Sequence, residues 1–224
     1  MRLIFFASLL FLSSFISAQN SNPANDPEAG ELLKKASNKY EAYKNISADF
    51  RLIIAHPKLK PQDDDRKYTD TISGTVLLQQ KKFKIEMKGQ EITCDGINLW
   101  TYIIKDKEVQ LNYFEESDDM LSPSKIFSLY KEGFLYSIRE KKTVGGKATT
   151  VIEMSPSGKK LSYFKIDVTI DETSLQVLET KIYEKNGTRY IYKLTHQTPN
   201  TPIKDGTFVF DAKNYPGIKV VDLR

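Results

Sequence analysis

Polar and apolar residues alternate along most of the chain after residue 46, which is the pattern of β-strands with one buried and one solvated face. The clearest alternating segments are residues 82–88, 164–170 and 189–194. In the first of them, Phe83, Ile85 and Met87 are separated by lysine and glutamate. Turn pairs such as Asp95-Gly96 lie between many of the segments and predict hairpins.

Further segments have strand character and lie close together in the sequence. They are residues 48–55, 71–79, 90–94, 98–104, 108–114, 134–140, 148–154, 175–184 and 206–210. A flat sheet of this many strands would leave apolar surface uncovered, so we expect it to curl. The predicted fold class is mainly β: an unclosed antiparallel β-barrel, or strongly curved sheet, of about 11 strands with a short helical lid.

Two segments have helical rather than strand periodicity, and both are expected to cover the sheet. The first spans about residues 27–44, where Asp26 can cap the helix and Pro27 fits its first turn. The second spans about residues 122–132, where Ser122 and Pro123 give the same start signal. Its apolar stripe consists of Ile126, Phe127, Leu129 and Tyr130.

The first 18 residues have the layout of a secretory signal peptide, with Arg2, an apolar run and the small pair Ser17-Ala18. The apolar run is shorter than the roughly 20 residues that a membrane-spanning helix needs. Residues 19–25 are polar and small, and we expect a disordered lead there. Residues 26–224 then form a single domain, and the expected location is the periplasm.

The composition argues against several classes of function. The formal net charge is only +4, and lysines and glutamates are interleaved, so we expect no nucleic-acid partner. Ser122-Pro123-Ser124-Lys125 matches the Ser-x-x-Lys pattern of penicillin-recognising enzymes, but no Lys-Thr-Gly accompanies it. Cys94 is the only cysteine, and the two histidines lie far apart in the sequence. We therefore expect no enzyme, no metal site and no cofactor.

The apolar residues themselves suggest binding rather than catalysis. Aromatic and long aliphatic side chains recur along the strands, but a filled core and an apolar pocket use the same residues. An incomplete barrel covered by short helices could open between its layers without breaking the sheet. The pattern alone leaves core and cavity open.

The order of several motifs resembles that of LolA-type periplasmic carriers of outer-membrane lipoproteins. The matching segments are Ser47-Ala48-Asp49-Phe50, Ser73-Gly74-Thr75-Val76, Lys82-Phe83-Lys84-Ile85-Glu86, Asp95-Gly96-x-x-Leu99-Trp100-x-Tyr102, Pro123 to Tyr130, and Phe208 through Gly217-Ile218-Lys219-Val220-Val221-Asp222. The resemblance implies an unclosed barrel with a helical lid. It also implies that acyl chains bind between sheet and lid.

The resemblance, together with the strand pattern, suggests a set of residues for the acyl cavity. They are Ile85, Met87, Trp100, Tyr102, Ile126, Phe127, Tyr130, Phe164 and Tyr190. Phe83 matches an aromatic that contacts the inner-membrane release complex in the family, although its strand face also allows a core position. One feature departs from the family: where proteobacterial members carry an Arg-Pro that helps to close the lid, this chain has Gln80-Lys81-Lys82.

The function expected from the resemblance is a monomeric carrier that moves lipoproteins from the inner to the outer membrane. Its partners would be acylated lipoproteins, the inner-membrane lipoprotein release complex and an outer-membrane acceptor. The alternative is an envelope sensor or structural protein of the same fold that binds another lipid, a protein or a polysaccharide. A hydrolase is a third, weaker alternative.

Overall fold

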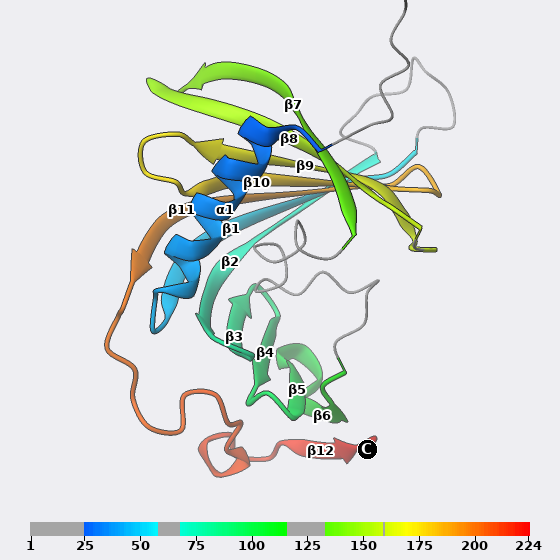
Figure 1. Cartoon of the computed structure of the whole chain (residues 1–224). Coiled ribbons are helices and arrows are strands. Elements are labelled where there is room, and N and C mark those ends of the chain that lie inside the picture. Colours follow the sequence, from blue (N-terminus) through cyan, green and yellow to red (C-terminus); the bar gives the residue numbers. More distant parts are fainter. Residues whose placement is uncertain (1–24, 58–67, 116–132, 159) are drawn as a thin grey trace, which may run out of the picture.

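The computed structural model describes residues 25–57, 68–115, 133–158 and 160–224, which form one strongly curved sheet of 12 strands with helix α1 against it (Figure 1). The helix spans Pro27–Glu41. The first six strands are β1 (Ile46–Ala55), β2 (Thr69–Gln79), β3 (Lys82–Met87), β4 (Gln90–Cys94), β5 (Asn98–Ile103) and β6 (Glu108–Tyr113). The remaining strands are β7 (Phe134–Val144), β8 (Lys147–Pro156), β9 (Tyr163–Asp171), β10 (Val177–Glu184), β11 (Arg189–Pro199) and β12 (Lys219–Asp222). Short 3-10 turns span Ile104–Asp106 and Ala212–Asn214.

The strand order is β12-β6-β5-β4-β3-β2-β1-β11-β10-β9-β8-β7. It consists of two antiparallel meanders, β1 to β6 and β7 to β11, which are joined where β1 pairs with β11. Among the strands of the described residues, only β12 runs parallel to its neighbour, β6. The prediction of a mainly β fold with an unclosed, curved sheet is confirmed, with 12 strands in place of about 11.

The end of the chain differs from the prediction. Residues 206–210 were expected to form a strand, but they form turns in which Val209 donates its N–H to the carbonyl of Gly206. Phe208 is buried, so its apolar character reflects packing of a non-strand segment rather than a place in the sheet. The last strand is formed instead by Lys219–Asp222.

Helix α1 begins where the sequence predicts, because Asp26 caps it. One carboxylate oxygen of Asp26 accepts the N–H groups of Glu28 and Ala29, and the other accepts the N–H of Ile138 in β7. The helix ends three residues before the predicted residue 44. Beyond that end, the N–H of Lys44 is bonded to the side chain of Asn200 rather than continuing the helix.

The hydrogen bonds to Asp26 make the attachment of α1 dependent on pH. They lower the pKa of Asp26 from 3.8, with the bond from Ile138 as the largest cause, followed by the bond from Ala29. The Asp26 carboxylate therefore binds a proton more readily in the unfolded chain than in the folded chain. The stability of the folded state that this carboxylate contributes is lost as the pH falls through the lowered pKa. Between about pH 5 and about pH 3, we expect the melting temperature of wild-type protein to fall more than that of Asp26→Asn, whose amide does not titrate. Equal falls in the two proteins would contradict this role.

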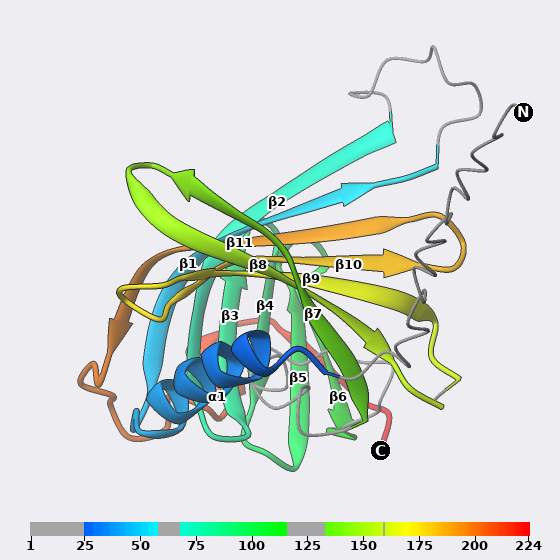
Figure 2. The ribbon, with the colours of Figure 1, turned by 45° about the horizontal axis from the view of Figure 1, so that its top comes forward.

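The main core lies between α1 and the strands β7 to β10. The helix contributes Ala29, Leu33 and Ala36, all buried. Figure 2 shows α1 lying across the curved sheet. The strands and the loop before β9 contribute Phe134, Ile152, Met154, Leu161, Tyr163, Ile166, Val168, Ile170, Val177 and Ile182. We call the sheet face that α1 contacts the interior face.

Candidate functional site

The interior face continues beyond α1 as an apolar surface over β11, β1, β2, β3, β4 and β5. Residues directly opposite one another in neighbouring strands share a face, which allows the surface to be traced through the register. Tyr190, which packs against the main core, is opposite Ile54, and Ile85 lies between Val76 and Ile92. The surface includes Phe50, Leu52, Ile54, Ile72, Ile85, Met87, Ile92, Leu99, Ile103, Tyr190, Tyr192 and Leu194.

All of these side chains are only partly buried. In contrast, Ile152, Ile166 and Ile170 beneath α1 have no exposed area. The interior face is therefore close-packed at the β7–β10 end. Over β11 and β1 to β5 it is partly accessible, except at the buried residues Ala48, Val76, Phe83 and Cys94. An accessible apolar surface of this kind is typical of a site for an apolar ligand or partner.

The C-terminal half of α1 is attached to β10 and β11 by polar contacts. The hydroxyl of Tyr40 accepts the N–H of Val177 at 3.0 Å and donates to Oε1 of Gln197 at 2.5 Å. Gln197 in turn donates to the carbonyl of Val177 at 2.8 Å, and Lys39 donates to the carbonyl of Ser174. Burial raises the pKa of Tyr40, so its hydroxyl stays protonated. These bonds fix α1 over one end of the interior face.

Three of the predicted acyl-binding residues, Ile85, Met87 and Tyr190, lie on this partly accessible surface. Phe83 shares the face but is only 7% exposed, and its ring packs edge-on against Phe114 with 5.5 Å between centroids. Of the two alternatives for Phe83, the structure therefore shows the core position.

Trp100 and Tyr102 were expected to line the cavity, but the structure places both on the opposite, exterior face. Within β5, Leu99 and Ile103 take the interior positions, so the residues between them point outward. The C-terminal segment packs against the exterior face here: the Tyr102 ring lies 5.7 Å from that of Phe210 and 4.9 Å from that of Tyr215. Both faces of β5 are thus apolar, and the sequence alone could not tell which one is interior.

Phe164 is also on the exterior face, although the sequence of its strand alternates cleanly. The register shifts at the start of β9, where Lys165 is opposite Tyr183 but Tyr163 is opposite Glu184. This bulge turns Tyr163 into the core, with 2% of its surface exposed, and leaves Phe164 45% exposed. Phe164 instead packs beside Tyr183, and the guanidinium of Arg189 lies 5.9 Å from its ring.

Several predictions fall outside the described residues. Ile126, Phe127 and Tyr130, with the predicted helix 122–132, belong to this group. The structure does describe Gln80-Lys81-Lys82, the segment in which the Arg-Pro of the resemblance is absent, and Lys82 is the first residue of β3. Gln80 and Lys81 form the two-residue turn between β2 and β3, with Gln80 in the left-handed region at a φ of 54°.

Sequence reasoning missed the interior residues Phe134, Tyr136 and Tyr163 of the core around α1. The alternation of side chains along β7 could have identified Phe134 and Tyr136, because these two residues share one face while Leu135 and Ser137 lie on the other. No local signal identifies Tyr163, since the bulge that turns it inward is visible only in the strand pairing.

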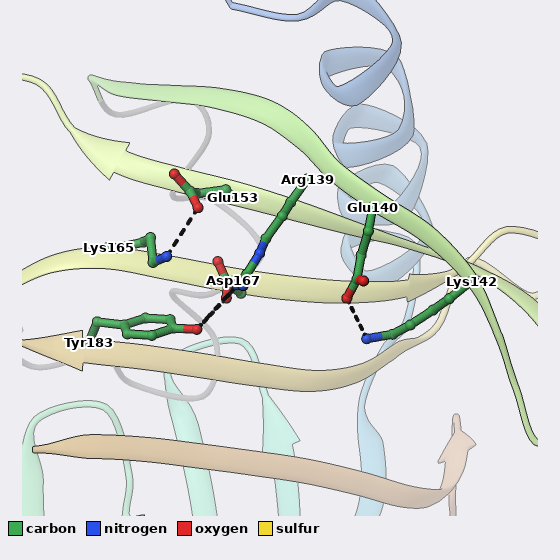
Figure 3. A network of polar contacts seen from close by, with 7 residues as sticks. All are labelled: Arg139, Glu140, Lys142, Glu153, Lys165, Asp167 and Tyr183. Atoms are coloured by element: carbon green, nitrogen blue, oxygen red, sulfur yellow. Dashed lines mark hydrogen bonds and ion pairs between the residues drawn. The ribbon is translucent and has the colours of Figure 1, made fainter. Parts of the chain in front are cut away.

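The exterior face of β7 to β10 carries a polar network (Figure 3). Asp167 is buried, and one of its oxygens accepts hydrogen bonds from Tyr183, at 2.6 Å, and from Arg139. Burial, followed by the bond to Asp167, raises the pKa of Tyr183. Lys165 and Glu153 form a neighbouring ion pair at 3.1 Å. The network links four strands on the face that points away from α1.

The described part of the chain contains no cluster of three or more His, Cys, Asp or Glu residues suited to hold a metal ion. Within the same residues, no helix has the length and apolar character needed to cross a membrane.

Several solved structures are similar to this chain, and the first one named here supports the fold. A conserved protein from Thermus thermophilus superposes with a TM-score of 0.56 at 9% identity, over 86% of this chain and 98% of that one. A putative outer-membrane lipoprotein-sorting protein domain from Vibrio parahaemolyticus has a TM-score of 0.44 at 12% identity, over 84% and 97% of the two chains. A LolA superfamily protein from Nitrosomonas europaea has a TM-score of 0.43 at 12% identity, over 82% and 98%.

A search of curated protein sequences returns no significant match. The family model described as "Outer membrane lipoprotein carrier protein LolA" matches residues 60–211, which is more than half of the chain. The unclosed sheet with its helix on the interior face agrees with that match. The chain therefore belongs to the LolA family of outer-membrane lipoprotein carrier proteins.

Proposed function

We propose that this protein is a periplasmic carrier that binds the acyl chains of lipoproteins on the interior face of its sheet. The observation that carries the proposal is the group of partly accessible apolar side chains on the interior face of β11 and β1 to β5. Membership of the LolA family supports an acylated cargo. The proposal includes export through the predicted signal peptide.

Apolar burial supplies enough affinity for such a cargo. Each methylene of an acyl chain transferred from water to an apolar surface contributes about 0.8 kcal/mol. Charged groups such as Lys84 and Glu86 point to the exterior face of β3, which leaves Ile85 and Met87 on the interior face to contact the chain. The proposed carrier needs no catalytic residue. It would receive its cargo from an inner-membrane release complex and pass it to an outer-membrane acceptor.

The proposal is tested first by the lipid content of protein purified from its own periplasm. We expect mass spectrometry of an organic extract to find acylated peptide or lipid, and a fluorescent fatty acid to bind delipidated protein with a Kd on the order of 1 μM, or about 8 kcal/mol. Protein that contains no lipid and does not bind the probe would contradict the proposal.

A matched pair of variants in β3 locates the binding surface. Ile85→Lys places a charge on the interior face, whereas Glu86→Lys changes the charge on the exterior face of the same strand. Because an unpaired charge against an acyl chain is costly, we expect Ile85→Lys to weaken probe binding about tenfold or more and Glu86→Lys to leave it unchanged. Circular dichroism checks that both variants keep their strand content. Equal affinities in the two variants would place the binding site elsewhere.

A transfer assay separates a carrier from a lipid-binding sensor of the same fold. Loaded protein is mixed with outer-membrane vesicles, and the lipoprotein remaining on the protein is measured. A carrier releases its cargo to the vesicles. A protein that binds lipoprotein but never releases it would contradict the carrier function while leaving the binding surface intact.

A further inference from the structure

A groove of about 640 Å³ lies on the sheet where β2, β1 and β11 are neighbours, and its lining includes Phe50 and Gly74. Its polar lining consists of Asp49, Arg51, Ser73, Thr75, Lys193 and Thr195. These residues alternate with interior residues such as Phe50 and Leu194, so they point to the exterior face. The groove and the apolar surface therefore use opposite faces of the same strands.

Two cations face each other in this groove. Arg51 of β1 is directly opposite Lys193 of β11, and like charges in this arrangement destabilise a sheet. Lys193 has one compensating partner, Glu179, at 3.3 Å. Among the described residues, no carboxylate pairs with Arg51.

In another like-charged pair of the sheet, each member has a polar partner. Glu86 and Glu91 are directly opposite in β3 and β4. Lys84 lies 2.6 Å from Glu86, and the hydroxyl of Tyr215 donates to Glu91 at 3.1 Å. Arg51 differs from these two carboxylates, because its exposed side chain has no such partner among the described residues and lies beside a second cation.

Hydroxyl groups surround the two cations. Ser73 is opposite Arg51 in β2, and Thr75 and Thr195 lie on either side of Asp49. Within the described part of the chain, these three hydroxyls make no hydrogen bond to another residue. Asp49, the only carboxylate among the described residues that line the groove, is 2.9 Å from Nδ1 of His196. A guanidinium, an ammonium and free hydroxyls together form a donor set suited to phosphate oxygens.

We propose that this exterior groove binds a phosphate group, with Arg51 and Lys193 as its charged ligands. A bound phosphate would neutralise the repulsion between the two cations, and the hydroxyls would donate to its remaining oxygens. The phosphate could belong to an anionic lipid headgroup or be free in solution, since both present the same oxygens. The proposal does not depend on the function proposed for the interior face.

The test compares wild-type protein with the double variant Arg51→Gln/Lys193→Gln. Lys105→Gln serves as the control, because Lys105 is 87% exposed and lies in the turn after β5. In one arm, inorganic phosphate is added and the melting temperature measured against sodium chloride of equal ionic strength. In the other arm, co-sedimentation is measured with phosphatidylglycerol vesicles and with phosphatidylcholine vesicles.

We expect the wild type and the Lys105 control to respond to phosphate, to phosphatidylglycerol, or to both, and the double variant to lose at least about tenfold in affinity for the same probe. A response to phosphate identifies a free anion, and a response to vesicles alone identifies a headgroup. The proposal is wrong if the double variant binds both probes as the wild type does, or if the wild type binds neither.

Discussion

Replacing Ile166 by alanine is expected to lower the free energy of unfolding by about 3 kcal/mol, the usual cost of truncating a buried isoleucine. Ile166 has no exposed area and lies in the core between β9 and α1. The cost has two parts, because the variant loses apolar burial and leaves a cavity that the close-packed neighbours fill only in part. Urea denaturation followed by circular dichroism measures the change.

The matched control is Phe164→Ala, two residues earlier in the same strand. Simple alternation would make the two residues equivalent, but the bulge leaves Phe164 45% exposed beside Tyr183 and Arg189. We expect this variant to lose about 1 kcal/mol or less, mainly the contact with the guanidinium and the neighbouring ring. A larger loss at Phe164 than at Ile166 would contradict the observed register.

Replacing Gly74 by alanine is expected to destabilise the fold by about 3 kcal/mol or more, because there is no room for the added methyl group. A Cβ at this position would lie 2.2 Å from the backbone oxygen of Glu86 in the neighbouring strand and 2.9 Å from the ring of Phe50. The first contact is with backbone, so β2 and β3 would have to separate. Chemical denaturation gives the size of the loss.

Ser73→Ala provides the control for Gly74. Ser73 precedes Gly74 in β2, and its exposed side chain points to the opposite face. We expect its removal to change stability by no more than about 0.5 kcal/mol. If Gly74→Ala were equally mild, the close approach of β2 and β3 at this position would be disproved.

Much of the fold follows from local sequence signals. The cap at Asp26 and the helical spacing after it predict α1, and the alternation in β3 predicts which of its residues share a face. The Asp95-Gly96 turn also forms where expected, with Asp95 accepting the N–H groups of Ile97 and Asn98. In each case the signal lies within a few residues, so no knowledge of distant partners is needed.

The candidate site was only partly predictable, because its membership depends on strand pairing. Ile85, Met87 and Tyr190 keep the predicted face, since their strands alternate without a bulge. Trp100 and Tyr102 lie on the opposite face from the predicted one. The C-terminal segment packs against the exterior of β5, so apolar residues occur on both faces of this strand. Phe164 was misplaced by a bulge that no property of its own strand reveals.

The junction of β1 and β11 has a consequence for the order in which the protein folds. Each meander consists of strands adjacent in sequence, but at the junction Asp49 and His196, 147 positions apart, come into contact. Contacts over such separations form late, because a long loop must close before they are gained. The two meanders can therefore assemble separately, whereas the surface that crosses from β11 to β3 exists only after they join. Completion of the interior apolar surface should coincide with the last and slowest step of folding.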